Sequence, residues 1–407
     1  MTWRMGFLAC ILIATGTAGI ALAQEPQRLA LSEALDRAEK QNLDLQAARA
    51  QRAVALAGVR IAGQRPNPSA SVSVLRDSPH ESLFFDQPLE IGSKRKRRIE
   101  LAQQEGALTE AGITALQRRV RREVREAYFG LAFARRVTAA KTDIAKLAER
   151  LRDIAKTRFE AGDIAQLEVT QAELELSRAN ADAQVAKREE QIALSRLNLL
   201  LNSPPASSWE LVSDLESPPR PLSLEELVDK ASGANAEIAR LAQEAKVEES
   251  RTNLLKAERI PNLGVQFGVD FNAPHDFREG PRGQLTMELP VFARNQGEIA
   301  QSSASLRAIE QEALAKRRAI ASQVESAFYE LNAREAQVIL YRQTLIPASR
   351  QLEEMAEESY RAGKANILMV LGSQRDVQQV DSEYLNSLLA MQTSVAQLEE
   401  TVGVPLD

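Results

Sequence analysis

Cysteine, histidine and aromatic residues are scarce in this sequence. Its 407 residues include one cysteine and two histidines, and aromatic residues make up only 4% of the chain. The cysteine, Cys10, lies in an N-terminal segment that we expect to be removed, so the mature chain would have no thiol, disulfide or cysteine metal ligand. The sequence has no histidine pair at helical spacing, no phosphate-binding glycine loop and no nucleophile elbow. It therefore indicates a protein that is not an enzyme, and it predicts no cofactor and no metal site.

Long hydrophobic runs are also missing once the N-terminus is set aside. Residues 1–23 are typical of a secretory signal peptide, with Arg4 at the start, an apolar stretch after it, and the small-x-small site Ala21-Leu22-Ala23. Beyond them no stretch approaches ~18 apolar residues, the length of a membrane-spanning helix. The remaining charge, 51 − 1 basic residues against 56 acidic ones, gives no reason to expect nucleic acid as a partner. The exported chain is expected either to be soluble or to enter a membrane through strands.

What the sequence does contain is an internal repeat. Pro66-Asn67 returns as Pro261-Asn262, and Phe159-x-Ala161-Gly162 returns as Tyr360-x-Ala362-Gly363, in both cases about 200 positions later. Solenoid repeats are far shorter, at roughly 20–50 residues. We therefore expect one supersecondary unit that is duplicated into a pseudo-symmetric chain, with a first repeat over residues 24–212 and a second over residues 213–407.

Most of the mature chain is rich in strong helix formers, with apolar residues at intervals of three and four. Such a seam favours long helices that pack along their lengths at a shallow angle. Helices are predicted at 31–64, 93–160 and 165–201 in the first repeat and at 223–259, 294–360 and 366–402 in the second. The helix over 93–160 would be a rod of roughly 100 Å. Pro347 should interrupt its counterpart in the second repeat.

Each repeat also contains two short segments in which polar and apolar residues alternate. We predict strands at 67–76 and 82–91 in the first repeat and at 262–271 and 283–292 in the second. About ten residues is the length that a tilted strand needs to cross a bilayer. Phenylalanines gather in or beside these segments, as aromatic residues do at the edges of membrane barrels. Soluble hairpins with one face packed on helices stay open as the alternative.

Four strands are too few to close a barrel. An open strand edge in lipid would leave backbone N–H and C=O groups unpaired, at a cost of several kcal/mol each, so closure would need other copies of the chain. Two copies would give eight strands and an interior filled by side chains, whereas three would give twelve strands around a water-filled lumen. Small or polar residues on one side of the strands, among them Ser71, Ser73, Gln266 and Asp270, are predicted to line that lumen.

Several motifs, taken in order along the chain, resemble those of the TolC-type outer-membrane efflux factors. They are the duplicated Pro-Asn pairs at 66–67 and 261–262, the segment QPLEIGSKR at 87–95, the segments EAYF at 126–129 and SAFY at 326–329, and the glycine turns at 159–162 and 360–363. The resemblance covers essentially the whole mature chain. Residues 88–98 are similar to the heavy-metal branch of that family, the cobalt–zinc–cadmium resistance type.

The resemblance implies a mainly α fold with a small β part, in which long antiparallel helical hairpins carry two β-hairpins per chain. It implies a homotrimer with a twelve-stranded barrel in the outer membrane of a Gram-negative bacterium, among its lipids, and a twelve-helix tunnel in the periplasm. The channel would be a passive exit duct for heavy-metal cations. An inner-membrane pump of the resistance–nodulation–division class would deliver them through a periplasmic adaptor. Alternatives are the same duct serving drugs or type I protein secretion, and a periplasmic coiled-coil adaptor or scaffold.

Both glycine turns lie between long helical segments, where a glycine ordinarily ends a helix in the left-handed conformation. A plain hairpin turn is therefore one interpretation. The resemblance instead places both turns at the periplasmic tip, where the adaptor docks and the channel is gated. The residues concerned are Ala161, Gly162, Asp163 and Ile164 in the first turn and Ala362, Gly363, Lys364 and Ala365 in the second. Asp163 and Lys364 have opposite charges at equivalent places and could pair between neighbouring hairpins, at about 0–1 kcal/mol for an exposed pair.

Well-known members of the family have two aspartates after the second turn, which form cation-binding rings in the pore. The equivalent positions here are Met369 and Gly372, and Asp376 is a weak substitute, so that site is not expected.

The basic run from Lys94 to Arg98 follows a predicted strand directly and is the densest charge cluster of the chain. We expect Lys94, Arg95 and Arg98 at the junction between barrel and helices. There they would form a solvated face, an anchor to lipid phosphates or a positive collar in the lumen. His80 and His275 lie at equivalent positions in outer loops and are expected to be remnants of the duplication and not a metal site.

Overall fold

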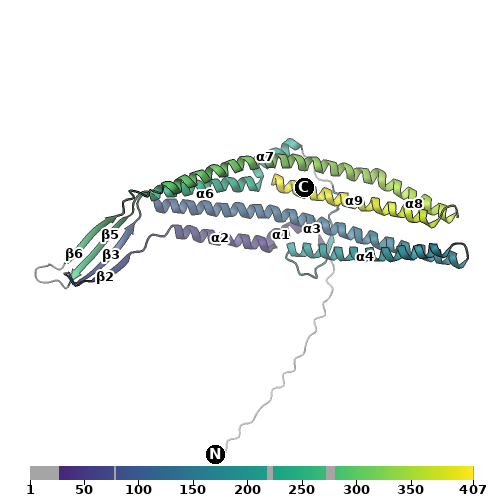
Figure 1. Ribbon diagram of the computed structural model, residues 1–407, viewed down its shortest axis with the longest axis horizontal. Helices are drawn as coiled ribbons and strands as arrows, with labels where there is room; N and C mark the ends of the chain where they lie inside the picture. Colours follow the sequence, from purple (N-terminus) through teal and green to yellow (C-terminus); the bar gives the residue numbers. More distant parts are fainter. Residues whose placement is uncertain (1–26, 78, 218–222, 272–279, 407) are drawn as a thin grey trace, which may run out of the picture.

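The computed structural model describes residues 27–77, 79–217, 223–271 and 280–406. The signal peptide predicted at 1–23 and the loop residue His275 lie outside the described residues. The chain is mainly helical, with a small sheet at one end of a long bundle of helices (Figure 1). In the described part of the chain, no helix combines the length and the apolar character that crossing a membrane requires.

The two repeats share an order of two helices, two strands of the sheet and a long helical hairpin, and the short strands β1 and β4 belong to the first repeat alone among the described residues. The first consists of β1 (Gln27–Leu29), α1 (Leu31–Gln41), α2 (Leu43–Ala62), β2 (Ser69–Val74), β3 (Glu81–Leu89), α3 (Lys94–Glu160), α4 (Gln166–Leu200) and β4 (Trp209–Leu211). The second consists of α5 (Leu224–Ala234), α6 (Ala236–Glu258), β5 (Leu263–Phe271), β6 (Gly280–Met287), α7 (Gln296–Leu340), the π-helical turn η1 (Tyr341–Leu345), α8 (Ile346–Arg361) and α9 (Ile367–Val402).

The helices predicted at 31–64 and 223–259 are each broken in two by an asparagine, which corrects both predictions. The side chain of Asn42 accepts hydrogen bonds from the backbone N–H groups of Asp44 and Leu45, both at 3.1 Å, and thereby caps α2. Its amide nitrogen donates to the carbonyl of Leu200 at 3.1 Å. In the second repeat Asn235 caps α6 in the same way and donates to the carbonyl of Thr401 at 2.7 Å. Each break is thus fixed by a cap that also fastens the end of a long helix.

α3 is one continuous helix of 67 residues, roughly 100 Å long. Its counterpart, predicted as one helix over 294–360, is divided into α7, η1 and α8. The division lies directly before Pro347, which is in the first turn of α8. Because proline lacks a backbone N–H and its ring clashes with the carbonyl four residues earlier, the regular helix cannot continue, and the turn widens into a π-helix. The interruption expected at Pro347 therefore takes the form of η1.

The long helices lie side by side. Near the sheet their order is α2, α3, α6, α7, and toward the opposite end it is α4, α3, α9, α8 (Figure 1). At both ends of the bundle α3 packs against a helix of the second repeat, which is α6 near the sheet and α9 toward the opposite end. The hairpin turns after α3 and after α8 therefore meet at the end of the molecule farthest from the sheet.

The largest hydrophobic core lies near the middle of the bundle, under two short strands that were not predicted from the sequence. β1 and β4 form a parallel pair that joins Gln27 to Trp209. Tyr128 of α3 is fully buried below them, and its hydroxyl donates to the carbonyl of Leu29 at 2.8 Å and accepts from the N–H of Ser213 at 2.9 Å. The same hydroxyl also accepts from the N–H of Val212 at 3.2 Å, so a buried phenol bonded to three backbone groups fixes β1 and the segment after β4 against α3.

The four predicted strands form one antiparallel sheet in the order β2-β3-β5-β6, so that β3 and β5 join the two repeats. The bounds of β3 and β5 lie close to the predicted 82–91 and 262–271, and β2 is shorter than the predicted 67–76. β6 runs over 280–287 instead of 283–292, which is a correction. It ends before Pro290, whose missing N–H would interrupt the ladder.

Candidate functional site in the sheet, the junction and the helical tips

The sheet has one polar and one apolar face. Residues paired directly across an antiparallel ladder point to the same side, so the register assigns each side chain to a face. It places Ser71, Ser73, Gln266 and Asp270, the four candidate lumen residues, together on one face. Residues on that face are Ser69, Ser71, Ser73, Ser82, Phe84, Asp86, Pro88, Gly264, Gln266, Gly268, Asp270, Gly280, Arg282, Gln284 and Thr286. All but Phe84 and Pro88 are polar or glycine.

Asp270 is the most buried charged group of this face, with 2% of the residue exposed. One of its carboxylate oxygens accepts a hydrogen bond from the hydroxyl of Ser82 at 2.8 Å, and the other pairs with Nε of Arg282 at 2.5 Å. The three residues come from β5, β3 and β6, so the cluster crosses three neighbouring strands. Because both oxygens of this buried carboxylate are bonded, Asp270 holds the three strands together and is not free to contact a solute. Ser71, Ser73 and Gln266 are the more exposed of the lumen candidates.

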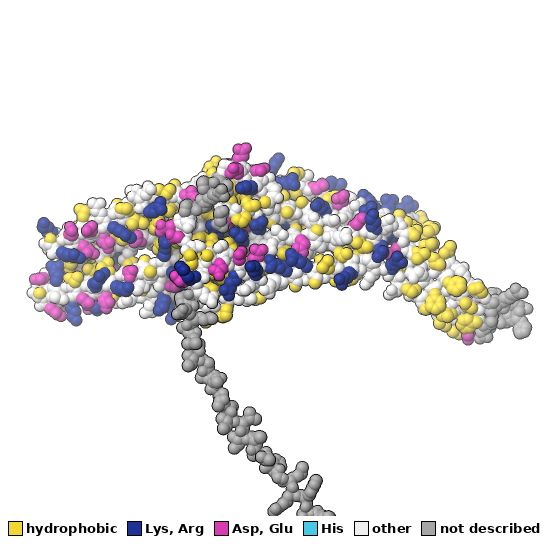
Figure 2. All heavy atoms as spheres, turned by 180° about the vertical axis from the view of Figure 1, so that it is seen from behind, with side chains coloured by type: hydrophobic (Ala, Val, Ile, Leu, Met, Phe, Trp, Pro, Cys, Tyr) yellow, Lys and Arg dark blue, Asp and Glu magenta, His cyan; other side chains and the backbone are white. Residues whose placement is uncertain are grey.

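The opposite face of the sheet is exposed and apolar. Its exposed large side chains are Val72, Val74, Phe85, Leu89, Phe267, Val269, Phe271, Leu285 and Met287, which range from 36% to 75% exposed. Figure 2 shows hydrophobic side chains gathered over this end of the molecule. In a single chain this contiguous patch faces solvent. Soluble proteins usually expose apolar residues singly and not as a continuous patch. The face therefore requires a nonpolar environment outside the chain.

Both edges of the sheet are unpaired in the single chain. Within the described residues β2 pairs only with β3, and β6 pairs only with β5. An exposed edge strand is a template for pairing with another chain. Both edge strands, β2 and β6, could therefore pair with a strand of another chain.

The passage from the sheet to the helices is built around two residues in the left-handed conformation. Gly92 has φ +78°, and Ser93, just before α3, has φ +64°. A Cβ at position 92 would come within 2.5 Å of Ile260 Cδ1, so only glycine fits. The second repeat uses Asn295, with φ +54°, at the corresponding place before α7.

The three junction candidates all bond within the chain. Lys94, 7% exposed, donates from Nζ to Oδ1 of Asn262 at 2.6 Å. Arg95 donates to the carbonyl of Gly63 at 2.5 Å, and Arg98 donates to the carbonyl of Gln64 at 3.2 Å. Arg98 also holds the carboxylate of Glu90 through two hydrogen bonds. Arg95 and Arg98 therefore satisfy carbonyls past the end of α2, where a positive charge also suits the helix dipole, and they fasten α2 to the start of α3. Lys94 fastens the start of α3 to the second repeat.

The two tip turns are nearly identical. Gly162 has φ +82° and Gly363 has φ +70°, and each N–H closes the preceding helix by donating to the carbonyl three residues earlier. The tip candidates are exposed except for Ile164 and Ala365, which are half-buried. Among the described residues of one chain, neither Asp163 nor Lys364 forms an ion pair. The proposed pairing between these two charges therefore stays a prediction for neighbouring chains.

Below the turns the two hairpins contact each other, through residues outside the predicted tip set. Leu151, Ala155 and Ala172 of the first hairpin pack with Tyr360, Val370 and Leu371 of the second. The guanidinium of Arg158 lies 5.0 Å from the ring centre of Tyr360. Arg375 of α9 forms an ion pair with Glu175 of α4. No sequence signal marks these contacts, because each joins residues about 200 positions apart.

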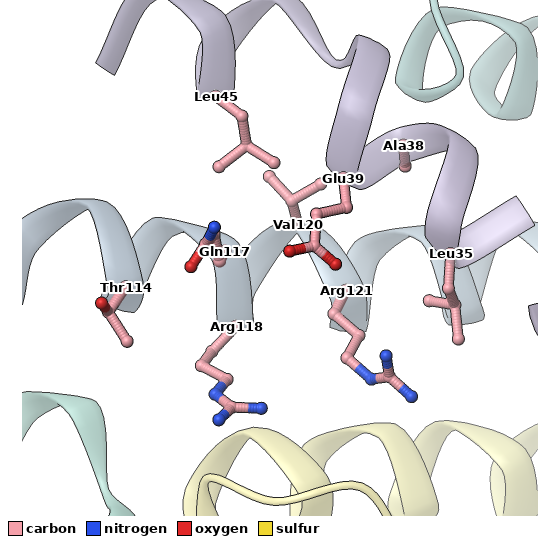
Figure 3. A pocket seen from close by; sticks show the side chains of 9 residues that line it. All are labelled: Leu35, Ala38, Glu39, Leu45, Thr114, Gln117, Arg118, Val120 and Arg121. Carbon is pink, nitrogen blue, oxygen red and sulfur yellow. The ribbon is translucent and has the colours of Figure 1, made fainter. Parts of the chain in front are cut away.

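A cavity of about 170 Å³ lies where α1 and α2 bend over α3. In Figure 3 the side chains of Arg118 and Arg121 extend away from α1 and α2. Leu35, Ala38, Leu45 and Val120 supply apolar walls. We interpret this cavity as a consequence of the bend at Asn42 and assign it no ligand.

Comparisons with known proteins agree with this architecture. The sequence pattern of the family "Outer membrane efflux protein" matches residues 34–203 and 227–404, one segment in each repeat. The chain belongs to the outer membrane efflux protein family. The cobalt-zinc-cadmium resistance protein CzcC of Cupriavidus metallidurans is 26% identical over 379 residues, which cover 92% of this chain and 90% of the relative. The nickel-cobalt-cadmium resistance protein NccC of Alcaligenes xylosoxydans xylosoxydans is 28% identical, over 78% of this chain and 74% of its own.

Solved structures share the fold of this efflux protein. A membrane protein from Pseudomonas aeruginosa has a TM-score of 0.77 at 18% identity, over 92% of this chain and 90% of that one. CusC has a TM-score of 0.74 at 16% identity, over 92% of both chains. The family consists of channels and not of enzymes, and the alternative of a periplasmic adaptor is wrong for an efflux protein that matches along both repeats.

His80 and the positions equivalent to the family's aspartate rings complete the set of candidates. His80 lies in the loop between β2 and β3, 3.4 Å from the carbonyl of Leu75. Within the described residues no group of three or more histidine, cysteine, aspartate or glutamate side chains is arranged to hold a metal ion. Met369 is 57% exposed on α9, and Asp376 is exposed on the same helix.

Proposed function

We propose that three copies of this efflux protein form a channel through the outer membrane of a Gram-negative bacterium. The observation that carries the proposal is the sheet of four strands, with an apolar face, a polar face and two unpaired edges. Joining β6 of one copy to β2 of the next would pair both edges, and three copies would give twelve strands. That number surrounds a lumen wide enough for water, whereas eight would be filled by side chains. The apolar face would then contact lipid, and Ser71, Ser73 and Gln266 would line the water-filled side.

The helical part supports the same assembly. α2 and α4 lie along one long edge of the bundle, and α7 and α8 along the other (Figure 1). Both edges expose large apolar side chains, which are Leu167, Leu174, Val185, Ile192 and Leu199 on α4 and Leu314, Leu340, Leu352 and Met355 on α7 and α8. On α4 most of them recur at multiples of seven, as in a coiled-coil seam. Packing these edges against each other would close a tunnel of twelve helices below the barrel.

The tips would be the periplasmic entrance. Ala161 to Ile164 and Ala362 to Ala365 would dock a periplasmic adaptor, which connects the channel to an inner-membrane pump of the resistance–nodulation–division class. The contacts Arg158–Tyr360 and Arg375–Glu175 hold the two hairpins together just below the turns. The Arg375–Glu175 pair is exposed and therefore weak, which suits a closure that must open.

The proposed cargo is heavy-metal cations, because two relatives are cobalt-zinc-cadmium and nickel-cobalt-cadmium resistance proteins. The channel would be a passive duct, and the pump would select the ion. Drugs or exported proteins are the second candidate cargo, since the fold alone accommodates them.

Two experiments test these proposals. Purified in detergent, the protein should have the mass of three chains and mostly helical circular dichroism, whereas a monomer that stays in aqueous solution without detergent would refute the channel.

Deleting the gene should lower tolerance to zinc, cobalt, cadmium or nickel. Unchanged metal tolerance together with lost dye tolerance would transfer the cargo to drugs.

A further inference from the structure

A groove of about 360 Å³ between α3 and α9 stays open near the tips. Its apolar walls are Val137, Ile144 and Leu147 of α3 and Val377 and Leu385 of α9. Closer to the sheet the same two helices are bridged by the chain itself. There the segment after β4 lies across them, with Leu215 only 1% exposed. The open groove is thus the continuation of a site that the protein already fills with one of its own segments.

The way this segment is held shows what the groove recognises. Arg136 of α3 donates to the carboxylate of Asp214 at 2.9 Å and to that of Glu216 at 3.0 Å. Gln392 of α9 donates from its amide nitrogen to the backbone carbonyls of Leu215 and Ser217, both at 3.0 Å. An arginine on one helix therefore holds two acidic side chains, and a glutamine on the other holds the backbone between them.

The open groove repeats both recognition groups. Gln374 lies 392 − 374 = 18 positions from Gln392, which is about five helical turns and therefore the same face of α9. It is 6% exposed, and its amide nitrogen has no hydrogen-bond partner among the described residues. Arg150 lies 150 − 136 = 14 positions, two heptads, after Arg136 and lines the groove. In the described part of the chain Arg150 forms no ion pair. A buried donor without an acceptor indicates a missing partner.

We propose that this groove binds an extended acidic segment of the periplasmic adaptor, in which a leucine-sized residue lies between two acidic residues, as in Asp214-Leu215-Glu216. The inference rests on the proposed function, because it takes the adaptor as the partner. The apolar side chain would enter the groove, Arg150 would pair with the acidic residues, and the amide of Gln374 would donate to a backbone carbonyl. Glu353 and Asp381 line the same groove from α8 and α9, so a basic residue is expected where the segment passes them.

The test measures binding of the purified adaptor to the purified trimer in detergent. Gln374→Leu removes the donor at nearly constant volume, and Arg150→Glu reverses the charge. Each substitution should raise the dissociation constant of the adaptor about tenfold or more, because each leaves a partner group unpaired. Lys187→Glu on α4 is the control, because Lys187 is exposed and does not line the groove. It should change the constant less than about twofold. Variants are compared only as trimers with unchanged circular dichroism.

A synthetic peptide with the sequence of residues 212–217 serves as the second probe. It should compete with the adaptor for the wild-type trimer and fail to compete when Asp214 and Glu216 are replaced by Asn and Gln.

A benzophenone amino acid at Val377 should crosslink to an acidic, extended adaptor segment. A crosslink to a basic or helical segment would overturn the proposal, and so would wild-type affinity in both groove variants. If tip variants abolish binding while groove variants do not, the groove inference is wrong and the proposed channel stands. If the wild-type trimer binds no adaptor, the tripartite proposal fails and takes this inference with it.

Discussion

At the scale of single residues, Gly268 shows how tightly the polar face of the sheet is packed. A Cβ added at this position would come within 2.2 Å of Phe84 Cδ1 and 2.6 Å of the carbonyl oxygen of Leu83. Because the second contact is with backbone, a rotation of the ring cannot relieve it. We expect Gly268→Ala to reduce the amount of heat-resistant trimer in detergent, through a destabilisation of about 1–3 kcal/mol typical of overpacking.

The matched control for this substitution is Gly283→Ala in β6. Gly283 also lies in the sheet, but a Cβ there would meet no atom within 4 Å. The control should assemble like the wild type. Equal losses in both variants would show that the sheet rejects any alanine, and that the contact with Phe84 and Leu83 is not the cause.

Asp381 of α9 gives the stability of the helical part of the chain a pH dependence. Burial raises the pKa of Asp381 above its ordinary value, and the nearby Arg350 only partly opposes this. A carboxyl with a higher pKa in the folded state than in the unfolded state stabilises the fold at low pH. That contribution is lost as the pH rises from the unfolded value, about 3.9, through the raised folded value. Asp381→Asn should therefore raise the melting temperature at pH 7.5 and leave it nearly unchanged at pH 3.5.

The exposed Asp376, on the same helix, provides the comparison for this pH series. Asp376→Asn should leave the melting temperature nearly unchanged at both pH values. If Asp381→Asn were equally stabilising at pH 3.5, its effect would come from packing and not from the carboxylate charge. Removing the charge should also ease ionisation of Glu353, because burial first, and then the charges of Glu357 and Asp381, raise the pKa of that group.

At the scale of elements, the ion pair between Arg375 and Glu175 joins helices of the two hairpins near the tips. Arg375→Glu would place two negative charges together and should favour an open tip. Since an exposed pair contributes about 0–1 kcal/mol, the open-to-closed ratio should rise by up to about fivefold. Single-channel conductance in planar bilayers measures this ratio. The double substitution with Glu175→Arg restores opposite charges and should return the conductance to the wild-type value; if it stays high, the pair is not what holds the tip.

Local sequence patterns predicted the elements well where a period continues over many residues. Alternation located all four strands of the sheet, and the seam around Val124 located the long α3. The breaks at Asn42 and Asn235 escaped notice because the helical period continues across them, and only the capping bonds reveal the stop. β1 and β4 are three residues long, too short to show any period. The ion-paired hairpins and the bonded junction cations arise from tertiary packing, which a local pattern does not encode.

At the scale of the whole molecule, the exposed apolar stripe on α4 requires a neighbour. Ile192 is 69% exposed in the single chain and lies in that stripe with Val185 and Leu199. Burying such a side chain contributes about 1.5–3 kcal/mol, and a closed trimer would bury it three times. Ile192→Glu should therefore lower the trimer-to-monomer ratio in detergent at least about tenfold, as measured by light scattering. Gln191→Glu adds the same charge at the exposed neighbouring position, which lies outside the stripe, and should leave the ratio unchanged. If both substitutions had the same effect, net charge would control assembly. If neither had any, the helices would meet along another face, and the barrel strands alone would have to join the copies.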